Sequence, residues 1–231
     1  MFESLAYVVA FRYYMRDRER RGDFLPDPER SSLMVAAIVG AAAGSKMLDW
    51  LEDPAVVLAH WRDPAILVGG KTVAGALLGG TMAVELAKRK LGIGRRTGDL
   101  FVTPLALGIA IGRVGCFLTG LDDHTYGTAT SLPWAVDFGD GVGRHPTQIY
   151  ELLALAAAIP LLRRFDRVKP REGDVFRLFL FGYCGWRVLV DFLKPDPRFG
   201  GMSAIQWACA GAMVWYARDI LRILRERRGN G

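Results

Sequence analysis

The stretch "FGGMSAIQWACAGAMVWYA" (199–217) runs for 19 residues without an Asp, Glu, Lys or Arg. A helix that crosses a lipid bilayer needs about 20 mainly apolar residues, and this stretch meets that length. Further charge-free runs cover residues 31–45, 72–84 and 100–112. The average over all 231 residues, 23% charged and 51% hydrophobic, resembles that of a soluble protein. The clustering of the charges, and not the composition, therefore indicates a membrane protein.

Extending these runs to their polar ends predicts about seven membrane-spanning helices, over residues 1–15, 32–50, 65–87, 98–119, 147–163, 173–194 and 202–222. Lys and Arg cluster after every second one, at 16–21, 88–96, 163–171 and 222–228. Loops rich in Lys and Arg face the cytoplasm. We therefore predict an all-α, polytopic membrane protein with its N-terminus outside and its C-terminus inside, folded as a single transmembrane domain over residues 1–231.

A basic surface for nucleic acid would not produce this alternation, so we expect no nucleic-acid partner, although the net charge is +6. The alternative is a soluble bundle with buried helices. Cys116, Cys184 and Cys209 are odd in number and form no CxxC pair, which predicts buried thiols without a disulfide or zinc site. The three histidines lack metal-ligand spacing, so we expect no metal and no cofactor.

The longest segment between predicted spans, 120–146, contains five glycines and two prolines. Long loops of this kind are usually functional when they are ordered, and the charge pattern places this one outside the cytoplasm. Within it, "SLPWAVDF" (131–138) alternates enough to predict an extended strand at the membrane interface, where Trp134 is expected to act as an anchor. We expect 120–146 to be an extracytoplasmic functional loop.

Arg113 lies toward the outer end of the fourth predicted span, with glycines at 112 and 115. Ionisable residues inside spans are energetically costly and are usually functional. A guanidinium in a low-dielectric environment needs an anion, and phosphate matches its geometry well. The alternative is an arginine whose side chain extends to the lipid headgroups.

The segment "RHPTQIYE" (144–151) leads into the fifth predicted span. His145, Gln148, Tyr150 and Glu151 crowd around a helix start that follows Pro146. Proline suits the first turn of a helix, and Glu there complements the helix dipole. A well-capped helix and a polar binding site are both compatible with this pattern.

Tyr183, Arg187, Asp191 and Lys194 follow one another at steps of four, four and three residues in the sixth predicted span. This spacing places them on one face of a helix, which must then face the protein interior. Arg187 and Asp191 can pair with each other. The cations Arg113, Arg187 and Lys194 nevertheless outnumber Asp191, and an anionic ligand would restore the balance.

These motifs resemble one known family. "GRVGCFLTGLDDHTYG" (112–127), "LPWAVDF" (132–138), "RHPTQIYE" (144–151) and "YCGWRVLVDFLKPD" (183–196) occur in the order found in the phosphatidylglycerol–prolipoprotein diacylglyceryl transferase family. The weaker "GGKTVAGALLGG" (69–80) is similar to the glycine-rich third span of that family. The resemblance covers most of the chain and implies seven transmembrane helices with the N-terminus outside.

The resemblance also implies a reaction at the outer face of the bacterial inner membrane. The diacylglyceryl group of phosphatidylglycerol is transferred to the lipobox cysteine thiol of a preprolipoprotein, a thioether forms, and glycerol-1-phosphate leaves. The expected partners are therefore phosphatidylglycerol, the preprolipoprotein signal peptide and membrane lipids. Arginines in place before the reaction would stabilise the charge that develops on phosphate, and the incoming thiol needs a base or a cationic neighbour.

By matching position, Arg113 and Arg187 correspond to the family's essential arginines, and we expect them to hold the phosphate. Tyr183, Asp191 and Lys194 stand where the family has Tyr, Glu and Arg. The same resemblance assigns four residues of the motif at 144–151 to the headgroup pocket, namely His145, Gln148, Tyr150 and Glu151.

Several positions depart from the family pattern. Ala74 replaces a histidine of the third span, and Lys71, one helical turn earlier, is expected to face the same cavity. Cys116 replaces an asparagine. The inserted "LDDHTYG" (121–127) offers Asp122, Asp123 and His124 as substitutes, of which His124, with an ordinary pKa of about 6.5, is the better base. A related transferase with a non-lipoprotein acceptor, or a lipid-binding or lipid-transporting protein, are the alternatives.

Overall fold

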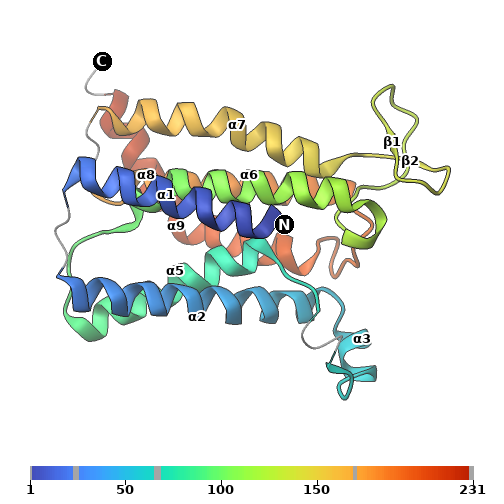
Figure 1. Cartoon of the computed structure of the whole chain (residues 1–231), viewed down its shortest axis with the longest axis horizontal. Helices are drawn as coiled ribbons and strands as arrows, with labels where there is room; N and C mark the ends of the chain where they lie inside the picture. Colours follow the sequence, from blue (N-terminus) through green and yellow to red (C-terminus); the bar gives the residue numbers. More distant parts are fainter. Residues whose placement is uncertain (1, 23–25, 65–68, 169–170, 229–231) are drawn as a thin grey trace. The chain divides into compact units, whose positions relative to one another are not determined.

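The computed structural model describes residues 2–22, 26–64, 69–168 and 171–228, and almost all of their regular structure is helical (Figure 1). The all-α prediction is therefore confirmed. By internal packing the chain divides into two compact units. The first contains residues 1–23, 96–195 and 216–231, and the second contains residues 24–95 and 196–215. The prediction of one transmembrane domain stays a prediction.

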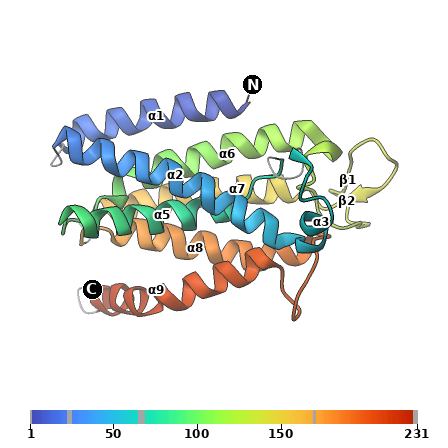
Figure 2. The same ribbon diagram turned by 90° about the horizontal axis from the view of Figure 1, so that it is seen from below.

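The first unit is a set of helices that pack in chain order. Its elements are α1 (Phe2–Arg21), η1 (Gly98–Phe101), α6 (Val102–Thr119), η2 (Gly120–Asp123), α7 (Thr147–Asp166), α8 (Asp174–Val190), η3 (Asp191–Leu193) and the end of α9 (Ala204–Arg228). Helix α1 packs on α6, α6 on α7, and α7 on α8. Figures 1 and 2 show that α6 runs antiparallel to both α1 and α7. The end of α6 therefore lies beside the start of α7.

Polar contacts stabilise the end of this unit at which α7 ends and α8 begins. The Asp99 carboxylate accepts hydrogen bonds from the backbone N–H groups of Gly173 (2.6 Å) and Phe176 (2.9 Å), which satisfies two donors at the start of α8. Arg222 of α9 forms two hydrogen bonds to the buried Asp174, at 2.7 and 3.2 Å. These contacts tie η1, α8 and the end of α9 together.

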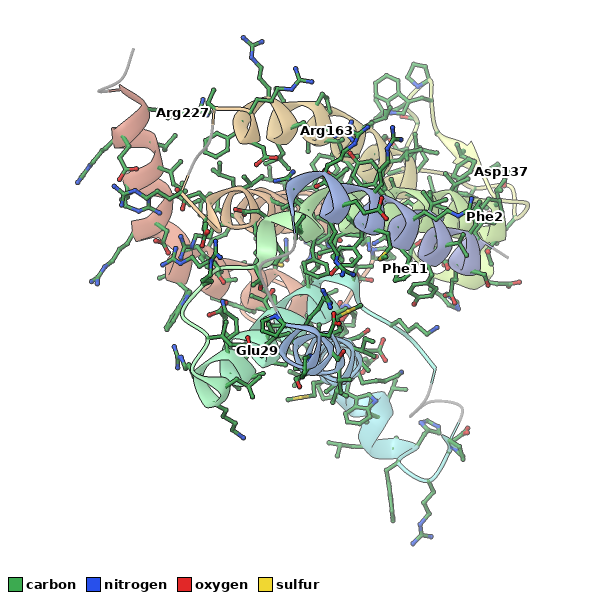
Figure 3. The ribbon with its side chains drawn as sticks, turned by 60° about the vertical axis from the view of Figure 1, so that its left-hand side comes forward. Phe2, Phe11, Glu29, Asp137, Arg163 and Arg227 are labelled. Atoms are coloured by element: carbon green, nitrogen blue, oxygen red, sulfur yellow. The ribbon has the colours of Figure 1, made fainter. Side chains whose placement is uncertain are left out.

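The same end also joins α1 to α7. Arg21 forms two hydrogen bonds to Asp166, at 2.5 and 3.2 Å. Arg163, which Figure 3 labels on α7, places its guanidinium carbon 5.0 Å from the ring centre of Tyr13. Arg21 and Arg163 both belong to the predicted cytoplasmic clusters, so these residues also hold helix ends together.

The second unit is built on α2 (Asp27–Glu52) and α5 (Val73–Leu91), with α3 (Pro54–Ala59) and the start of α9. Glycines let the two long helices approach closely: a Cβ atom on Gly40 would lie 2.6 Å from the carbonyl oxygen of Gly79, and one on Gly79 would lie 2.7 Å from the Cα of Gly44. Small residues at such contacts are the usual basis of helix packing in membranes.

Helix α5 begins later than the third predicted span, 65–87, of which residues 65–68 lie outside the described residues. Gly70 has a positive φ of 60°. Thr72 donates its N–H to the Ser45 side chain and its hydroxyl to the Ser45 carbonyl, both at 3.0 Å. Residues 69–72 are therefore held against α2 as non-helical chain. A short helix, α3, also forms in the predicted loop 51–64, because Pro54 suits a helix start and the Asp53 side chain accepts the Val56 N–H (3.2 Å).

Two helical segments of the described chain are long and apolar enough to cross a membrane by length and composition, Asp27–Glu52 and Gly98–Asp123. They correspond to the second and fourth predicted spans. The count of seven spans and the orientation of the termini stay predictions. The three cysteines, all of them described, form no disulfide; Cys184 and Cys209 are buried as predicted, whereas Cys116 is half-buried.

The loop between α6 and α7 carries a small hairpin of β1 (Val136–Asp137) and β2 (Gly143–Arg144), which lies beyond the N-terminal end of α7 (Figure 1). Strand β1 is shorter than the predicted strand over 131–138, because the chain turns at Pro133. In this turn the Ala135 N–H is bonded to the Leu132 carbonyl.

Asp137, labelled in Figure 3, fixes the tip of this hairpin: its Oδ1 accepts the N–H groups of Gly139, Asp140 and Gly141 at 2.8–3.1 Å. Arg144 donates two hydrogen bonds of 2.6 Å to the Asp140 carboxylate. These bonds lower the pKa of Asp140 and raise that of Arg144. The hairpin is therefore closed by a side-chain turn and a bidentate ion pair.

Candidate functional site

A cluster of charged side chains lies inside the first unit, where α6 ends and α7 begins. Arg113 comes from α6, Glu151 from α7, Arg187 from α8 and Asp191 from η3, with Lys194 directly after it. All five are buried; Arg187 and Glu151 are only 2% exposed. The antiparallel packing of α6 and α7 explains why residues 38 positions apart in the sequence meet (Figure 1).

Glu151 is the centre of this cluster. Its Oε2 lies 3.0 Å from Arg113 Nε and 3.5 Å from Arg187 Nη1, so one carboxylate oxygen faces both guanidinium groups. Its Oε1 accepts a hydrogen bond of 2.8 Å from the Tyr183 hydroxyl. Buried charges are tolerated when they are paired and hydrogen-bonded in this way.

Asp191 holds the other side of Arg187, with Oδ1 2.8 Å from Arg187 Nη2 and 3.9 Å from Lys194 Nζ. The Arg187–Asp191 pair that the helix spacing allowed is thus present. The charge balance differs from the one drawn from the sequence, because Glu151 belongs to the cluster. Within this group of five described residues, three cations face two carboxylates, and the group carries one positive charge in excess.

Cys116 of α6 lies next to this cluster, and the segment after α6 is tied to the start of α7. Arg113 Nη1 lies 3.9 Å from the Cys116 sulfur. Asp123 Oδ2 accepts the Thr125 hydroxyl at 2.5 Å. The Thr147 hydroxyl, at the start of α7, bonds to the Thr125 carbonyl at 2.5 Å. Of the three candidates in the insertion, Asp123 is the one that the structure connects, through Thr125, to the start of α7, and its threonine partner was not expected from the sequence.

A second group of side chains surrounds Tyr150. The Trp134 indole N–H donates to the Tyr150 oxygen at 2.8 Å, and that oxygen lies 3.2 Å from His145 Nδ1. Because an indole can only donate, the Tyr150 hydroxyl proton is available to His145. Trp134 was predicted as an interface anchor; it is 57% exposed, and it also positions Tyr150.

His145 is fixed through its backbone. Its N–H bonds to the Thr128 carbonyl (3.1 Å), and its carbonyl accepts the Gly127 N–H (2.8 Å). A Cβ atom on Gly127 would lie 2.6 Å from the His145 Cβ, so this close approach requires glycine. The position of the imidazole is thus set by both the loop and α7.

Gln148 is only 1% exposed, and neither its amide nitrogen nor its amide oxygen has a hydrogen-bond partner among the described residues. It lies in the first turn of α7, between the buried Thr147 and Glu151. The sequence placed Gln148 in a headgroup pocket by resemblance alone, and its lack of partners emerges only in the folded chain.

Other predicted residues lie apart from these contacts. His124 is exposed and has a positive φ of 53°, where it ends η2, and Asp122 is exposed as well. Lys71 belongs to the second unit and is exposed, while Ala74 of α5 is buried. Their proposed roles stay predictions.

Apolar helices that enclose a buried polar cluster with excess positive charge are typical of a helical membrane protein. Comparison with family models matches residues 2–218 to "Prolipoprotein diacylglyceryl transferase". The chain belongs to this family and is an enzyme of the transferase class, so the resemblance seen in its motifs is confirmed.

Curated relatives agree with this assignment. A phosphatidylglycerol–prolipoprotein diacylglyceryl transferase of Bordetella avium is 33% identical over 98% of this chain and 90% of its own length. The enzyme of the same name from Idiomarina loihiensis is 34% identical over 88% of this chain and 81% of its own. That of Clostridium tetani is 32% identical, covering 75% and 71% respectively. The similarity therefore extends over the whole architecture.

Proposed function

We propose that this chain transfers the sn-1,2-diacylglyceryl group of phosphatidylglycerol to the lipobox cysteine of a preprolipoprotein. Support comes from relatives that are named for these two substrates. The observation that carries the proposal is the buried cluster of Arg113, Arg187 and Lys194 with Glu151 and Asp191, whose excess positive charge suits an anionic lipid headgroup.

The reaction needs only the lipid and the acceptor thiol as reactants. The acceptor sulfur forms a bond to the glyceryl carbon while the bond from that carbon to the phosphate oxygen breaks. The electron pair moves onto the phosphate, glycerol-1-phosphate leaves, and the thiol proton passes to a base. Charge thus develops on phosphate in the transition state, where fixed guanidinium groups stabilise it.

Arg113 and Arg187 are suited to this task because both already face one carboxylate oxygen of Glu151. A phosphate that binds between them must share or displace that carboxylate. Glu151 therefore sets the spacing of the two guanidinium groups before substrate arrives, and Tyr183 orients Glu151 through its hydroxyl. We assign Arg113 and Arg187 to the phosphate, and Tyr183 and Asp191 to holding these groups in place.

We further propose that seven helices span a bacterial inner membrane, with the N-terminus and loop 120–146 outside and the C-terminus inside. The position of the cluster supports this orientation. Arg113, Glu151 and Asp191 lie at the helix ends next to that loop, whereas the basic residues Arg163 and Arg222 lie at the opposite ends. The reacting centre would then face the outer leaflet.

His145, Gln148, Tyr150 and Lys194 are proposed to line the headgroup site, together with Asp122 and Asp123. His124 is proposed as the base for the thiol. Replacing His124 with Ala should reduce turnover and leave lipid binding intact; unchanged turnover would contradict this role.

Reconstitution tests the main proposal. The purified protein is incorporated in nanodiscs with phosphatidylglycerol and given a lipobox peptide, and mass spectrometry measures the diacylglyceryl adduct on cysteine. Arg113→Ala and Arg187→Ala should abolish the adduct while thermal unfolding remains cooperative. Arg164→Ala removes an exposed arginine at the opposite end of α7 and serves as the matched control. Lipid binding without any adduct would refute the proposal.

One observation favours a second function. Ala74 is buried in α5 at the position where the family motif carries a histidine, which fits a transferase with a different acceptor. Release of glycerol-1-phosphate without a peptide adduct would support that alternative. Binding of phosphatidylglycerol with neither product would instead indicate a lipid-binding or transporting protein.

A further inference from the structure

Gln148 is a buried amide that the described protein leaves without hydrogen bonds. It is 1% exposed, and both its Nε2 and its Oε1 lack a partner among the described residues. The great majority of buried polar side chains are hydrogen-bonded, and the exceptions require an explanation. Because a buried donor and acceptor are costly to leave unpaired, the natural explanation is a ligand that satisfies both.

The place of Gln148 indicates which part of a ligand it would meet. Glu151 is three residues further along α7, on the same helix face, and its carboxylate contacts Arg113 and Arg187. Thr147, the neighbour on the other side, is anchored to the loop through the Thr125 carbonyl. The amide therefore lies in the first turn of α7, three residues before the carboxylate that faces both proposed phosphate ligands.

The two amide atoms restrict the chemistry of the ligand. A phosphate group only accepts hydrogen bonds, and an ammonium group only donates them, so either leaves one end of the amide unpaired. A hydroxyl group both donates and accepts. In addition, the excess positive charge of the cluster disfavours a cationic headgroup.

We propose that Gln148 recognises the hydroxyl groups of the lipid headgroup and thereby selects a glycerol headgroup over headgroups without hydroxyls. This inference rests on the proposed function and adds a specificity-determining residue to it. Sites built to hydrogen-bond a substrate hydroxyl reject analogues that lack it, because the buried polar groups are then left unpaired.

Headgroup recognition and a structural role for Gln148 predict different effects of its replacement on stability. If the amide supported the fold, its replacement would lower the unfolding temperature. Because the Gln148 amide has no partner among the described residues, Gln148→Met, of similar size and without an amide, should unfold at the same or a higher temperature in lipid-free detergent. Ile149→Leu, at the next position, is the matched control for side-chain replacement in this turn.

Headgroup selection is measured with two lipids of equal charge. Phosphatidylglycerol carries hydroxyls on its headgroup, and phosphatidylpropanol does not. Nanodiscs of each lipid receive the lipobox peptide, and kcat/KM for adduct formation is compared. The wild type and Ile149→Leu should prefer phosphatidylglycerol by about tenfold or more. In Gln148→Met the ratio should fall toward one, through a loss of kcat/KM on phosphatidylglycerol alone.

Each other outcome overturns the inference. An unchanged ratio in Gln148→Met would show that the amide does not recognise hydroxyls. Equal losses on both lipids, a lower unfolding temperature or failure to fold would identify a structural residue. If the wild type forms no adduct with either lipid, the proposed function fails, and native mass spectrometry still tests the inference: the wild type should retain phosphatidylglycerol over phosphatidylpropanol, and Gln148→Met should retain both equally.

Discussion

Replacing Glu151 with Leu removes the carboxylate that two buried arginines share. Arg113 is 6% exposed and Arg187 is 2% exposed, so water cannot take over the role of the carboxylate. Of the five charged groups, three cations would then face Asp191 alone. Arg113 loses its 3.0 Å contact, and the Tyr183 hydroxyl loses its acceptor.

The expected loss of stability is large. Removing one partner of a buried ion pair typically costs about 3–5 kcal/mol, because it leaves an uncompensated charge. For a chain of 150–250 residues, each kcal/mol lowers the unfolding temperature by about 2–4 °C. The unfolding temperature of Glu151→Leu should therefore fall by about 6–20 °C. Tyr183→Phe removes only one hydrogen bond to a charged group and should cost about 1.5–3 kcal/mol.

A double-mutant cycle separates the ion pair from simple side-chain loss. Arg113→Met combined with Glu151→Leu restores the original excess of one charge and leaves Arg187 paired with Asp191. Replacing both partners of a buried pair is often neutral for stability. The double variant should therefore be more stable than Glu151→Leu, with a coupling of at least about 2 kcal/mol, measured by thermal unfolding in detergent.

Adding an anion tests independently whether the position of the Glu151 carboxylate can bind a negative charge. Inorganic phosphate should raise the unfolding temperature of Glu151→Leu more than that of the wild type, because the vacated position lies between two guanidinium groups. If the stability losses of Arg113→Met and Glu151→Leu add up to that of the double variant within about 0.5 kcal/mol, the shared-carboxylate arrangement is refuted. Equal phosphate effects on both proteins would refute the conclusion that this position accepts an anion.

Three further perturbations test other parts of the structure. Gly79→Leu should prevent the close approach of α5 to the Gly40 carbonyl and cost more than about 3 kcal/mol in unfolding measurements, whereas a loss below about 1 kcal/mol would argue against this contact. Because Arg144 lowers the folded pKa of Asp140, the ion pair should stabilise the hairpin above pH of about 4 and lose this effect as pH falls through the lower folded pKa. Hydrogen exchange of the hairpin amides, corrected for intrinsic rates, should show this loss of protection at low pH. Asp140→Asn should abolish the pH dependence. Asp99→Ala should expose two backbone donors at the start of α8 and cost about 1–2 kcal/mol in chemical denaturation, and a loss near zero would mean that water replaces the cap.

Charge distribution along the sequence was sufficient for the helical class and for most helix positions. The limits of α7 and α8 lie within a few residues of the predicted 147–163 and 173–194. Apolar periodicity is a local property, so it can be read without the fold. The start of α5 at Val73 could not be read in this way, because the extended residues before it are fixed by hydrogen bonds to Ser45 on another helix.

The sequence by itself was sufficient to select the candidate residues for the chemistry of this protein: the two arginines, the polar start of the fifth predicted span and the four-residue stripe of the sixth. Motif spacing is local, and it sufficed to identify the family. Only the tertiary structure decided that Glu151 pairs with Arg113 and Arg187 and that Gln148 is left without a partner among the described residues. Such contacts depend on which helix ends meet when α6, α7 and α8 pack, and the spacing within each segment carries no information about the partners that another segment brings.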